Sequence, residues 1–490
     1  MRLFGFFVLI SAVVLGVGCG GGGSSDSNTT PAAVTSVRVT CTPATVRSGG
    51  TSTCSATVAG SGNYSTTVTW TTSAGSITAS GVFTAPLVSS ITPVTVTATS
   101  TQDGKRSGAA TVTVNPAGSA QNVHPIVVDS GPPGLGADYY INGLFTSVRV
   151  CEPGSTSRCQ TIDHVLVDTG AVGLRLLSSA AGGQLGLSLP AHTASDGNAL
   201  VQCMQFLDGF TWGPIALADI YLGDQLASSV PIQVIAPADA PAVPSSCQNT
   251  GGSNENTLSR LGTNGILGIG LFLEDCGDSC AQQALNVYYS CSNARCVETT
   301  VPTARQVQNP VALFSNDNNG FIVQLPSISS AGQDSVTGSL VFGIGTQPNN
   351  GLGNAAVYTT DARGNFTATY NSTSYSSSFI DSGSNGIFFL NPATTGLPAC
   401  QGVYSGFYCP TTETAFTVTN TGRNGVSGAV TFNVANAQTL IDSKKRAFNN
   451  LGGVLSGRFD YGLPFFFGRN VYVAIEGRNT PGGVGPYWAY

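Results

Sequence analysis

Two short segments of the chain carry an aspartate, a small hydroxyl residue and a glycine between apolar, strand-prone runs: Asp168-Thr169-Gly170, and Asp381-Ser382-Gly383 with Ser384 after it. Two carboxyl groups held a few ångströms apart cannot both ionise cheaply, so they share a proton. The ionised carboxylate can then take a proton from water while the protonated one hydrogen-bonds a carbonyl oxygen. This pair predicts amide hydrolysis with Asp168 and Asp381 as catalytic residues, and with neither a metal nor a cofactor.

The neighbouring residues have predicted supporting roles. The hydroxyls of Thr169 and Ser382 are expected to brace the two loops by hydrogen bonds, and glycine at the third position lets the backbone turn tightly behind each acid. The alternative is two unconnected β-turns, because Asp and Gly also occupy turns for conformational reasons. A third copy, Asp129-Ser130-Gly131, is read as such a turn because two prolines follow it and Asp168 is too close for a complete lobe to intervene.

Composition predicts an exported all-β protein. The 490 residues leave room for two or three domains, only 9% of them are charged, and the formal net charge is −6. Lys and Arg are scattered, which argues against a nucleic-acid partner. The chain has no Gly-x-Ser-x-Gly elbow and no phosphate-binding loop, and its three histidines make no convincing triad.

The N-terminus predicts export. Residues 1–19 combine Met1-Arg2, an apolar run and Gly16-Val17-Gly18-Cys19, which resembles a bacterial lipobox. In that interpretation Cys19 is lipidated, residues 20–33 form a flexible tether, and the protein is anchored in the cell envelope, at the outer membrane. The alternative is an ordinary signal peptide with an accidental cysteine, which would make the protein secreted.

Cysteine parity is consistent with export, because thirteen cysteines become an even twelve without Cys19. Pairing of near neighbours predicts four disulfides and two more within a cluster: Cys41–Cys54, Cys151–Cys159, Cys203–Cys247, Cys400–Cys409, and two bridges among Cys276, Cys280, Cys291 and Cys296. The alternative for that cluster is a zinc site, although it lacks the doubled Cys-x-x-Cys spacing.

Residues 34–116 alternate Thr and Ser with Val, Ile and Ala between turn residues, which is typical of a β-sandwich. Trp70 is the expected core aromatic. The segment resembles bacterial Ig-like domains in residues 48–51, 68–70 and 80–86, and nothing in it indicates chemistry. A linker at 117–127 is expected to separate it from the remaining chain, where residues 281–289 are the best helix candidate.

The remaining chain resembles the pepsin-like aspartic peptidases. The resemblance rests on five segments in the family's order: 165–176 and 379–389 as the catalytic loops, 264–270 and 466–469 as the hydrophobic-hydrophobic-Gly segments behind them, and 338–345 as the strand entering the second lobe. It implies a bilobal double-ψ β-barrel domain, with lobe 1 at 128–325 and lobe 2 at 326–490. It further implies a monomeric endopeptidase that binds an extended peptide between the lobes.

Three positions depart from the pattern of these peptidases. Ala171 replaces the usual Ser after the first motif, Phe206 takes the place of the Tyr at the flap tip, and Arg469 follows the last Gly in place of an acid. The whole chain also resembles an uncharacterised family of bacterial lipoproteins. The alternative to a cell-envelope aspartic endopeptidase is therefore an inactive surface lipoprotein on the same fold, which binds a protein or glycan partner.

Overall fold

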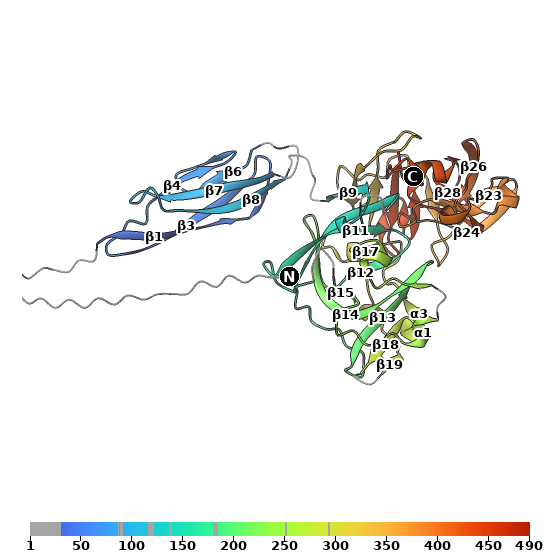
Figure 1. Ribbon diagram of the computed structural model, residues 1–490, viewed down its shortest axis with the longest axis horizontal. Coiled ribbons are helices and arrows are strands. Elements are labelled where there is room, and N and C mark those ends of the chain that lie inside the picture. The colour runs from blue at the N-terminus through green and yellow to red at the C-terminus, as the bar shows by residue number, and fades with distance from the viewer. Residues whose placement is uncertain are drawn as a thin grey trace, which may run out of the picture. The chain divides into compact units, whose positions relative to one another are not determined.

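The computed structural model describes residues 31–86, 88, 92–115, 122–136, 140–179, 185–249, 252–292 and 295–490. The chain divides into two compact units at residues 119 and 120 (Figure 1). The predicted signal segment, Cys19 and the tether up to residue 30 lie outside the described residues. Within the described ranges, no helix has the length and apolar character needed to cross a membrane.

The first unit consists of two four-stranded sheets. One has the strand order β1-β3-β6-β5 and the other β2-β8-β7-β4. The strands are β1 (Ala33–Thr42), β2 (Thr45–Arg47), β3 (Thr51–Ser61), β4 (Val68–Thr72), β5 (Ser76–Ile77), β6 (Val82–Thr84), β7 (Thr92–Ser100) and β8 (Ser107–Asn115). Apolar residues alternate with exposed Thr and Ser, so that each strand buries one face.

Buried residues from both sheets form shared clusters in this unit. The prediction that Trp70 is the core aromatic is wrong in part, because Trp70 is only half-buried against these clusters, whereas Phe83 is fully buried. Trp70 lies on β4, at the edge of its sheet, where fewer neighbours cover a large side chain.

The second unit is built on a sixteen-stranded sheet and a seven-stranded sheet. The larger sheet has the order β19-β18-β13-β14-β15-β12-β17-β11-β10-β9-β21-β20-β30-β33-β22, with β16 beside β14. Its strands are β9 (Val123–Asp129), β10 (Gly143–Cys151), β11 (Cys159–Asp168), β12 (Val172–Leu177), β13 (Ala199–Gln205), β14 (Gly209–Leu222), β15 (Gln225–Ile235), β16 (Ser253–Asn254), β17 (Gly265–Ile269), β18 (Tyr288–Cys291), β19 (Cys296–Glu298), β20 (Gly320–Gln324), β21 (Val336–Phe342), β22 (Val357–Thr359), β30 (Asn470–Ala474) and β33 (Tyr487–Ala489).

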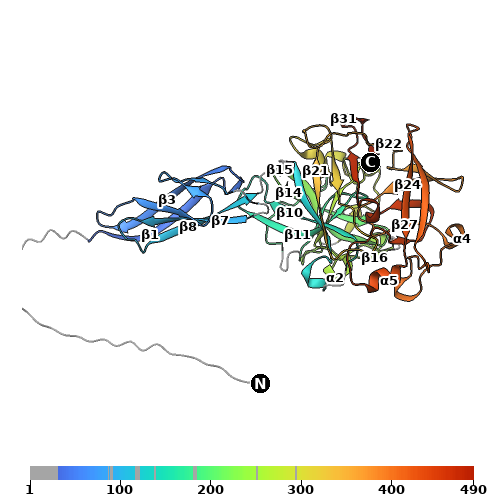
Figure 2. The same cartoon turned by 90° about the horizontal axis from the view of Figure 1, so that it is seen from above.

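The smaller sheet has the order β27-β26-β23-β24-β29-β25-β28, and β31 (Asn479–Thr480) pairs only with β32 (Gly483–Val484). Figure 2 shows β24 and β27 of this sheet toward the red end of the colour scale. The strands are β23 (Phe366–Tyr370), β24 (Thr373–Ile380), β25 (Ile387–Leu390), β26 (Thr414–Thr421), β27 (Ser427–Val434), β28 (Gly452–Gly453) and β29 (Leu455–Tyr461).

Part of the larger sheet closes on itself. An additional pairing of β14 with β10 completes a ring through β15, β12, β17 and β11, which gives the all-β unit a barrel-like core. Val165, Val167, Leu174 and Leu267, from three strands of this ring, have no exposed surface. The strands on either side of the first Asp-Thr-Gly motif, β11 and β12, are therefore fixed by close packing in the core of this ring.

Helices are short. They are α1 (Ser245–Gln248), α2 (Leu258–Leu261), α3 (Asp278–Gln282), α4 (Pro392–Thr395) and α5 (Ala437–Asp442), with 3₁₀ turns η1 (Pro133–Leu135), η2 (Thr303–Arg305), η3 (Pro310–Leu313), η4 (Gly402–Tyr404) and η5 (Leu463–Phe465). The prediction of a helix over 281–289 is wrong: α3 ends at Gln282, and Tyr288 and Tyr289 belong to β18. Pairing of β18 with β13 overrides the local helix propensity.

The predicted disulfides are confirmed. The described chain contains Cys41–Cys54, Cys151–Cys159, Cys203–Cys247 and Cys400–Cys409, and the cluster divides into Cys276–Cys280 and Cys291–Cys296. All four cysteines of the cluster are thus bonded to one another, and none is left as a thiolate to hold zinc.

Candidate active site

Both Asp-Thr/Ser-Gly motifs follow strands with the same local pairing. In the first copy, β11 runs parallel to β17, and β12, which follows the loop, runs antiparallel to the same β17. In the second copy, β24 runs parallel to β29 and β25 runs antiparallel to it. Each loop therefore joins two strands that both pair with the same third strand. Each aspartate follows the first of these two strands in both copies.

The register corrects one sequence assignment. Asp168 lies opposite Gly268, so residues 266–268 are the hydrophobic-hydrophobic-Gly segment of the first copy, within the predicted 264–270. In the second copy, Ile380 lies opposite Tyr461, and the Asp381 N–H donates to the Tyr461 carbonyl at 3.1 Å. The counterpart is therefore 460–462. The assignment to 466–469 is wrong because those residues follow η5, beyond the strand that pairs with the loop.

The two aspartates share a hydrogen-bond donor. The Gly170 N–H lies 2.7 Å from Asp168 Oδ1 and 3.1 Å from Asp381 Oδ1. The two Oδ1 atoms can be no further apart than the sum of these lengths, which is inside the distance of roughly 6 Å over which neighbouring charges shift a pKa strongly. The structure thus brings Asp168 and Asp381 together from opposite halves of the unit.

Thr169 and Ser382 join the two loops reciprocally. The Ser382 N–H donates to Thr169 Oγ1 at 2.9 Å, and the Thr169 N–H donates to Ser382 Oγ at 3.2 Å. The Ser382 hydroxyl in turn donates to the Val167 carbonyl at 2.7 Å. Thr169 and Ser382 are buried, so these bonds are shielded from water and hold the carboxyl groups in a fixed relation.

Gly170 and Gly383 have a different role from the one predicted. Neither has a positive φ, so neither is required by a left-handed turn. A Cβ atom added to Gly170 would lie 2.7 Å from Asp381 Cγ, and one added to Gly383 would lie 2.9 Å from Asp168 Cγ. Glycine is needed here because each loop lies directly against the carboxyl group of the other.

The two carboxyl groups have different surroundings. Asp168 accepts backbone N–H bonds from Gly170 and Ala171, at 2.7 and 3.0 Å. Burial, followed by the charge of Asp381 and a hydrogen bond with it, raises the pKa of Asp168 well above its usual range. Asp381 accepts the Gly170 N–H, the Gly383 N–H at 2.8 Å and the Ser384 hydroxyl at 2.9 Å. Asp381 thus has three hydrogen-bond donors around it, and Asp168 has two.

Sequence reasoning missed a third carboxyl group. Asp460 on β29 is 1% exposed, and its Oδ2 atom lies 2.7 Å from the Ser384 hydroxyl oxygen. Burial, and then the negative charge of Asp381, raise the pKa of Asp460 well above its usual range. The only available signal was its place directly before Tyr461-Gly462, which the misplaced second hydrophobic segment concealed.

A cleft of about 840 Å³ contains the aspartates of both motifs, Asp168 and Asp381. Both halves of the unit contribute to its lining, which includes Asp168, Asp381, Ser384, Asp460, Phe206, Leu207, Phe272, Phe379 and Phe388. Besides the polar groups of the two motif loops, charged side chains from other segments, Asp208, Glu255, Arg260 and Arg363, line the cleft together with the aromatic and aliphatic ones. A chain bound there would meet the carboxyl pair among apolar side chains and several charged ones.

The β13–β14 hairpin is at the position expected of a flap. Its turn places Phe206 and Leu207 along the cleft, and the Phe206 N–H donates to the Gly209 carbonyl at 2.7 Å. Phe206 is half-buried, whereas Leu207 is 78% exposed at the tip. The predicted flap residue therefore lines the cleft but offers an apolar ring in place of a hydroxyl.

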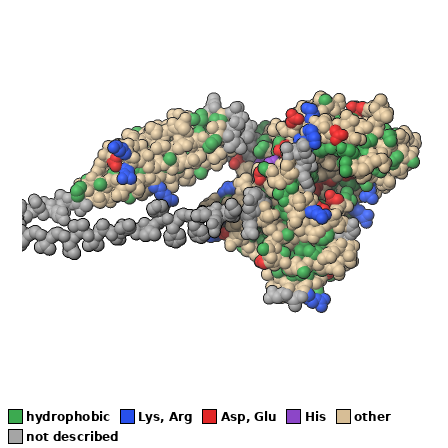
Figure 3. Space-filling model, in the orientation of Figure 1, with side chains coloured by type: hydrophobic (Ala, Val, Ile, Leu, Met, Phe, Trp, Pro, Cys, Tyr) green, Lys and Arg blue, Asp and Glu red, His purple; other side chains and the backbone are tan. Residues whose placement is uncertain are grey.

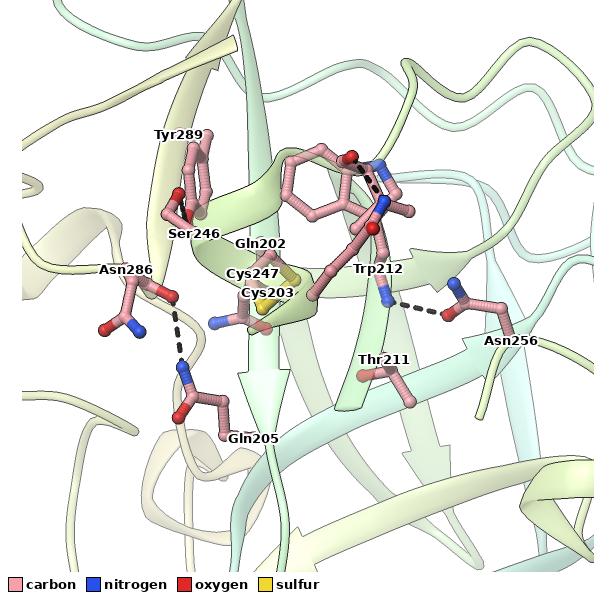
Figure 4. The surroundings of a disulfide bond; sticks show 12 residues. Gln202, Cys203, Gln205, Thr211, Trp212, Ser246, Cys247, Asn256, Asn286 and Tyr289 are labelled. Atoms are coloured by element: carbon pink, nitrogen blue, oxygen red, sulfur yellow. Dashed lines mark hydrogen bonds between the residues drawn. A yellow bond between two sulfur atoms is a disulfide. The ribbon is translucent and has the colours of Figure 1, made fainter. Parts of the chain in front are cut away.

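The base of this hairpin is held by the Cys203–Cys247 disulfide (Figure 4). Opposite Cys203 on the paired strand, Trp212 donates its indole N–H to the Pro241 carbonyl at 2.7 Å and its backbone N–H to Asn256 Oδ1 at 2.7 Å. Ser246, beside Cys247, hydrogen-bonds the Tyr289 hydroxyl at 2.8 Å. These contacts hold the hairpin below its turn; at the turn itself, the Asp208 carbonyl accepts the Ser253 N–H at 2.9 Å, while the Leu207 side chain remains exposed.

We expect replacement of both Cys203 and Cys247 by Ala to destabilise the protein by about 2–4 kcal/mol, because this disulfide closes a long loop. The looser flap base is also expected to raise the KM for a peptide more than it lowers kcat. Thermal unfolding and steady-state kinetics measure the two effects. The matched control is Cys400→Ala with Cys409→Ala, which opens a 9-residue separation away from the flap. An equal KM increase in the control would contradict the role of the flap base.

The third motif is a turn, separate from the pair. Asp129 ends β9 and accepts the Gly131 N–H at 2.9 Å through Oδ1. Its Oδ2 atom lies 3.2 Å from His164 Nε2, and it does not line the cleft. The Asp129 carboxylate, through this hydrogen bond, raises the pKa of His164.

A buried ion pair supports the first loop from behind. Arg175 on β12 has no exposed surface and donates to Asp275 Oδ2 at 2.8 Å. The Tyr288 hydroxyl and the Gln202 amide also donate to Asp275, at 2.7 and 2.5 Å. This network joins β12 to the flap strand β13 and to β18. Sequence reasoning gave these residues no role, because a lone Arg in an apolar run carries no signal of its distant partner.

Comparison with known proteins gives a structural neighbour and a family. An aspartic proteinase from Irpex lacteus is similar in structure, with 16% sequence identity, coverage of 75% of this chain and 96% of that chain, and a TM-score of 0.45. No curated protein matches the sequence. Residues 118–490, most of the chain, match the family described as "Protein of unknown function (DUF3443)". The chain therefore belongs to the DUF3443 family.

Proposed function

We propose that the second unit is an aspartic endopeptidase with a pepsin-like, bilobal arrangement, in which Asp168 and Asp381 activate water between them. The observation that carries the proposal is the Gly170 N–H shared by both carboxyl groups in a cleft lined from both halves. Paired loops, reciprocal Thr169–Ser382 bonds and the raised pKa of Asp168 support it.

The mechanism follows from the unequal surroundings of the pair. Asp381, with three donors, is the ionised member and takes a proton from a water molecule held between the carboxyl groups. Asp168, protonated, donates a hydrogen bond to the substrate carbonyl oxygen. The resulting hydroxide equivalent adds to the carbonyl carbon, the tetrahedral intermediate collapses, and the leaving nitrogen takes up a proton from the pair. An extended peptide across the cleft would place its carbonyl there.

The test is hydrolysis of a diverse peptide library from acidic to neutral pH by the full exported chain. Cleavage with an acidic optimum, blocked by a statine-type transition-state mimic, is expected. Absence of cleavage of any peptide across this range would overturn the proposal.

The rival function is a non-catalytic surface protein that uses the cleft to bind a protein or glycan. The observation that favours it is the pair Ala171 and Phe206, which leaves Asp168 without a hydroxyl donor from its own loop and the flap without a phenol. In that case Asp168→Asn and Asp381→Asn would leave ligand binding intact.

The rest of the chain fits an envelope protein. In this proposal residues 34–116 form an Ig-like spacer, Cys19 carries the lipid anchor, and the peptidase unit acts as a monomer on extracytoplasmic protein. On the face in Figure 3, Lys and Arg are scattered, so this face offers no continuous basic surface for nucleic acid. Metabolic labelling with a fatty-acid analogue, lost in Cys19→Ala, tests the anchor.

A further inference from the structure

The Ser384 hydroxyl lies between two carboxyl oxygens and cannot donate its single proton to both at once. Its oxygen is 2.9 Å from Asp381 Oδ2 and 2.7 Å from Asp460 Oδ2. A hydroxyl has one proton to donate, so both contacts are hydrogen bonds only if one of the two carboxyl groups is itself protonated and donates to the serine oxygen. The geometry therefore requires a proton on Asp381 or on Asp460.

The surroundings assign this proton to Asp460. The Oδ1 atom of Asp381 accepts two backbone N–H bonds, from Gly170 and Gly383, which would stabilise a negative charge. The Oδ1 atom of Asp460 is buried and has no hydrogen-bond partner. A negative charge on Asp460 would thus have almost no donors to stabilise it, and a neutral carboxyl group costs far less to bury.

The charged groups around Asp460 point the same way. Asp381 faces it with negative charge, Asp168 adds to this whenever it is ionised, and Arg458, on its own strand, opposes them. The strands paired with β29 at this point, β24 and β25, contain no Asp, Glu, Lys, Arg or His. The corresponding residue of the first copy is Ile266, so the third carboxyl group belongs to one loop only.

We propose that Asp460 is a positioning residue whose proton is donated to Ser384, so that the Ser384 hydroxyl is turned toward Asp381 and keeps Asp381 ionised. At high pH, Asp460 releases this proton to solvent through the cleft that it lines. The Ser384 hydroxyl then turns to the new Asp460 carboxylate and Asp381 loses a donor. Asp168, Asp381 and Asp460 are thus linked, and ionisation of Asp460 sets an upper pH limit for activity. This inference rests on the proposed peptidase function.

The kinetic test is the pH profile of Asp460→Asn in the full chain. An amide N–H can donate to Ser384 as the protonated acid does, so kcat at the acidic optimum is expected to stay within about two-fold of wild type. Because the amide does not ionise, the alkaline limb of kcat/KM is expected to move up by about one pH unit. Asp460→Ala, which removes the donor, is expected to lose about ten-fold in kcat with little change in KM.

The route through the serine is tested in a Ser384→Ala background. If Asp460 acts through the hydroxyl, Asp460→Asn shifts the alkaline limb less in that background than in wild type. An equal shift in both backgrounds, or an unchanged alkaline limb in Asp460→Asn itself, would overturn the proposal.

A second measurement is independent of activity. A folded-state pKa raised by burial means that the folded protein binds more protons than the unfolded chain, so wild type loses stability as pH rises from about 4. Asp460→Asn removes that loss. Its unfolding temperature is expected to exceed that of wild type by at least about 2 °C at neutral pH, with the gap closing toward pH 4. If the wild type cleaves no peptide, the peptidase proposal fails, but this measurement still tests whether Asp460 is protonated. A difference in unfolding temperature that stays constant across pH would overturn the assignment of the proton to Asp460.

Discussion

Asp381→Asn is expected to lower kcat/KM for any cleaved peptide by at least about 10³-fold while the protein stays folded. The amide keeps the shape of the carboxylate but cannot take a proton from water. The Gly170 and Gly383 N–H groups that now bond Asp381 Oδ1 can still bond an amide oxygen. The loss should therefore fall on kcat, with near-UV circular dichroism and the unfolding temperature close to wild type. Asp168→Asn is expected to behave alike.

The chain supplies its own control. Asp129→Asn alters the same tripeptide type at the end of a strand, but Asp129 bonds His164 and lies outside the cleft lining. Its kcat/KM is expected to stay within about two-fold of wild type. Residual activity of more than about one tenth in Asp381→Asn, with the fold intact, would rule out the shared-carboxyl mechanism and favour the rival binding function.

The sequence was sufficient for features that depend on local pattern. Alternating apolar residues indicated an all-β chain, and pairs of cysteines a few residues apart indicated most disulfides correctly, because short separations leave few other partners. The repeated Asp-Thr/Ser-Gly phrase also indicated which aspartates the fold brings together. In the first two cases the signal lies in residues close together in the sequence, and in the third it lies in the repetition of one local phrase.

Features that depend on strand register could not be predicted from the sequence. Phe466-Phe467-Gly468 satisfies the hydrophobic-hydrophobic-Gly pattern better than Asp460-Tyr461-Gly462, yet only the latter lies at the end of β29, the strand paired with β24 just before the second loop. A polar residue at a core position hid the true segment. The Arg175–Asp275 bond was equally hidden, because its two residues are 100 positions apart and each satisfies the other only in the folded protein.

Gly170→Ala is expected to reduce kcat by roughly 10²-fold or more, since a misplacement of about 1 Å at a reacting group costs that much. The added methyl group would lie 2.7 Å from Asp381 Cγ and 2.8 Å from its Oδ1, so either the carboxyl group or the loop must move. The same N–H also bonds both aspartates, and a displaced backbone would lose these contacts together. In Gly383→Ala the added methyl group would lie 2.9 Å from Asp168 Cγ, so a similar loss of kcat is expected.

The control for this prediction is Gly351→Ala. A Cβ at Gly351 meets nothing within 4 Å, and its φ is not positive, so alanine fits without strain. Its kcat and unfolding temperature are expected to match wild type. If Gly170→Ala retained full activity, the two carboxyl groups would tolerate separation, and the catalytic centre would not depend on the close approach of the two loops. A fall in unfolding temperature without any fall in kcat would assign the glycine to packing alone, whereas a fall in kcat at unchanged KM assigns it to the geometry of the pair.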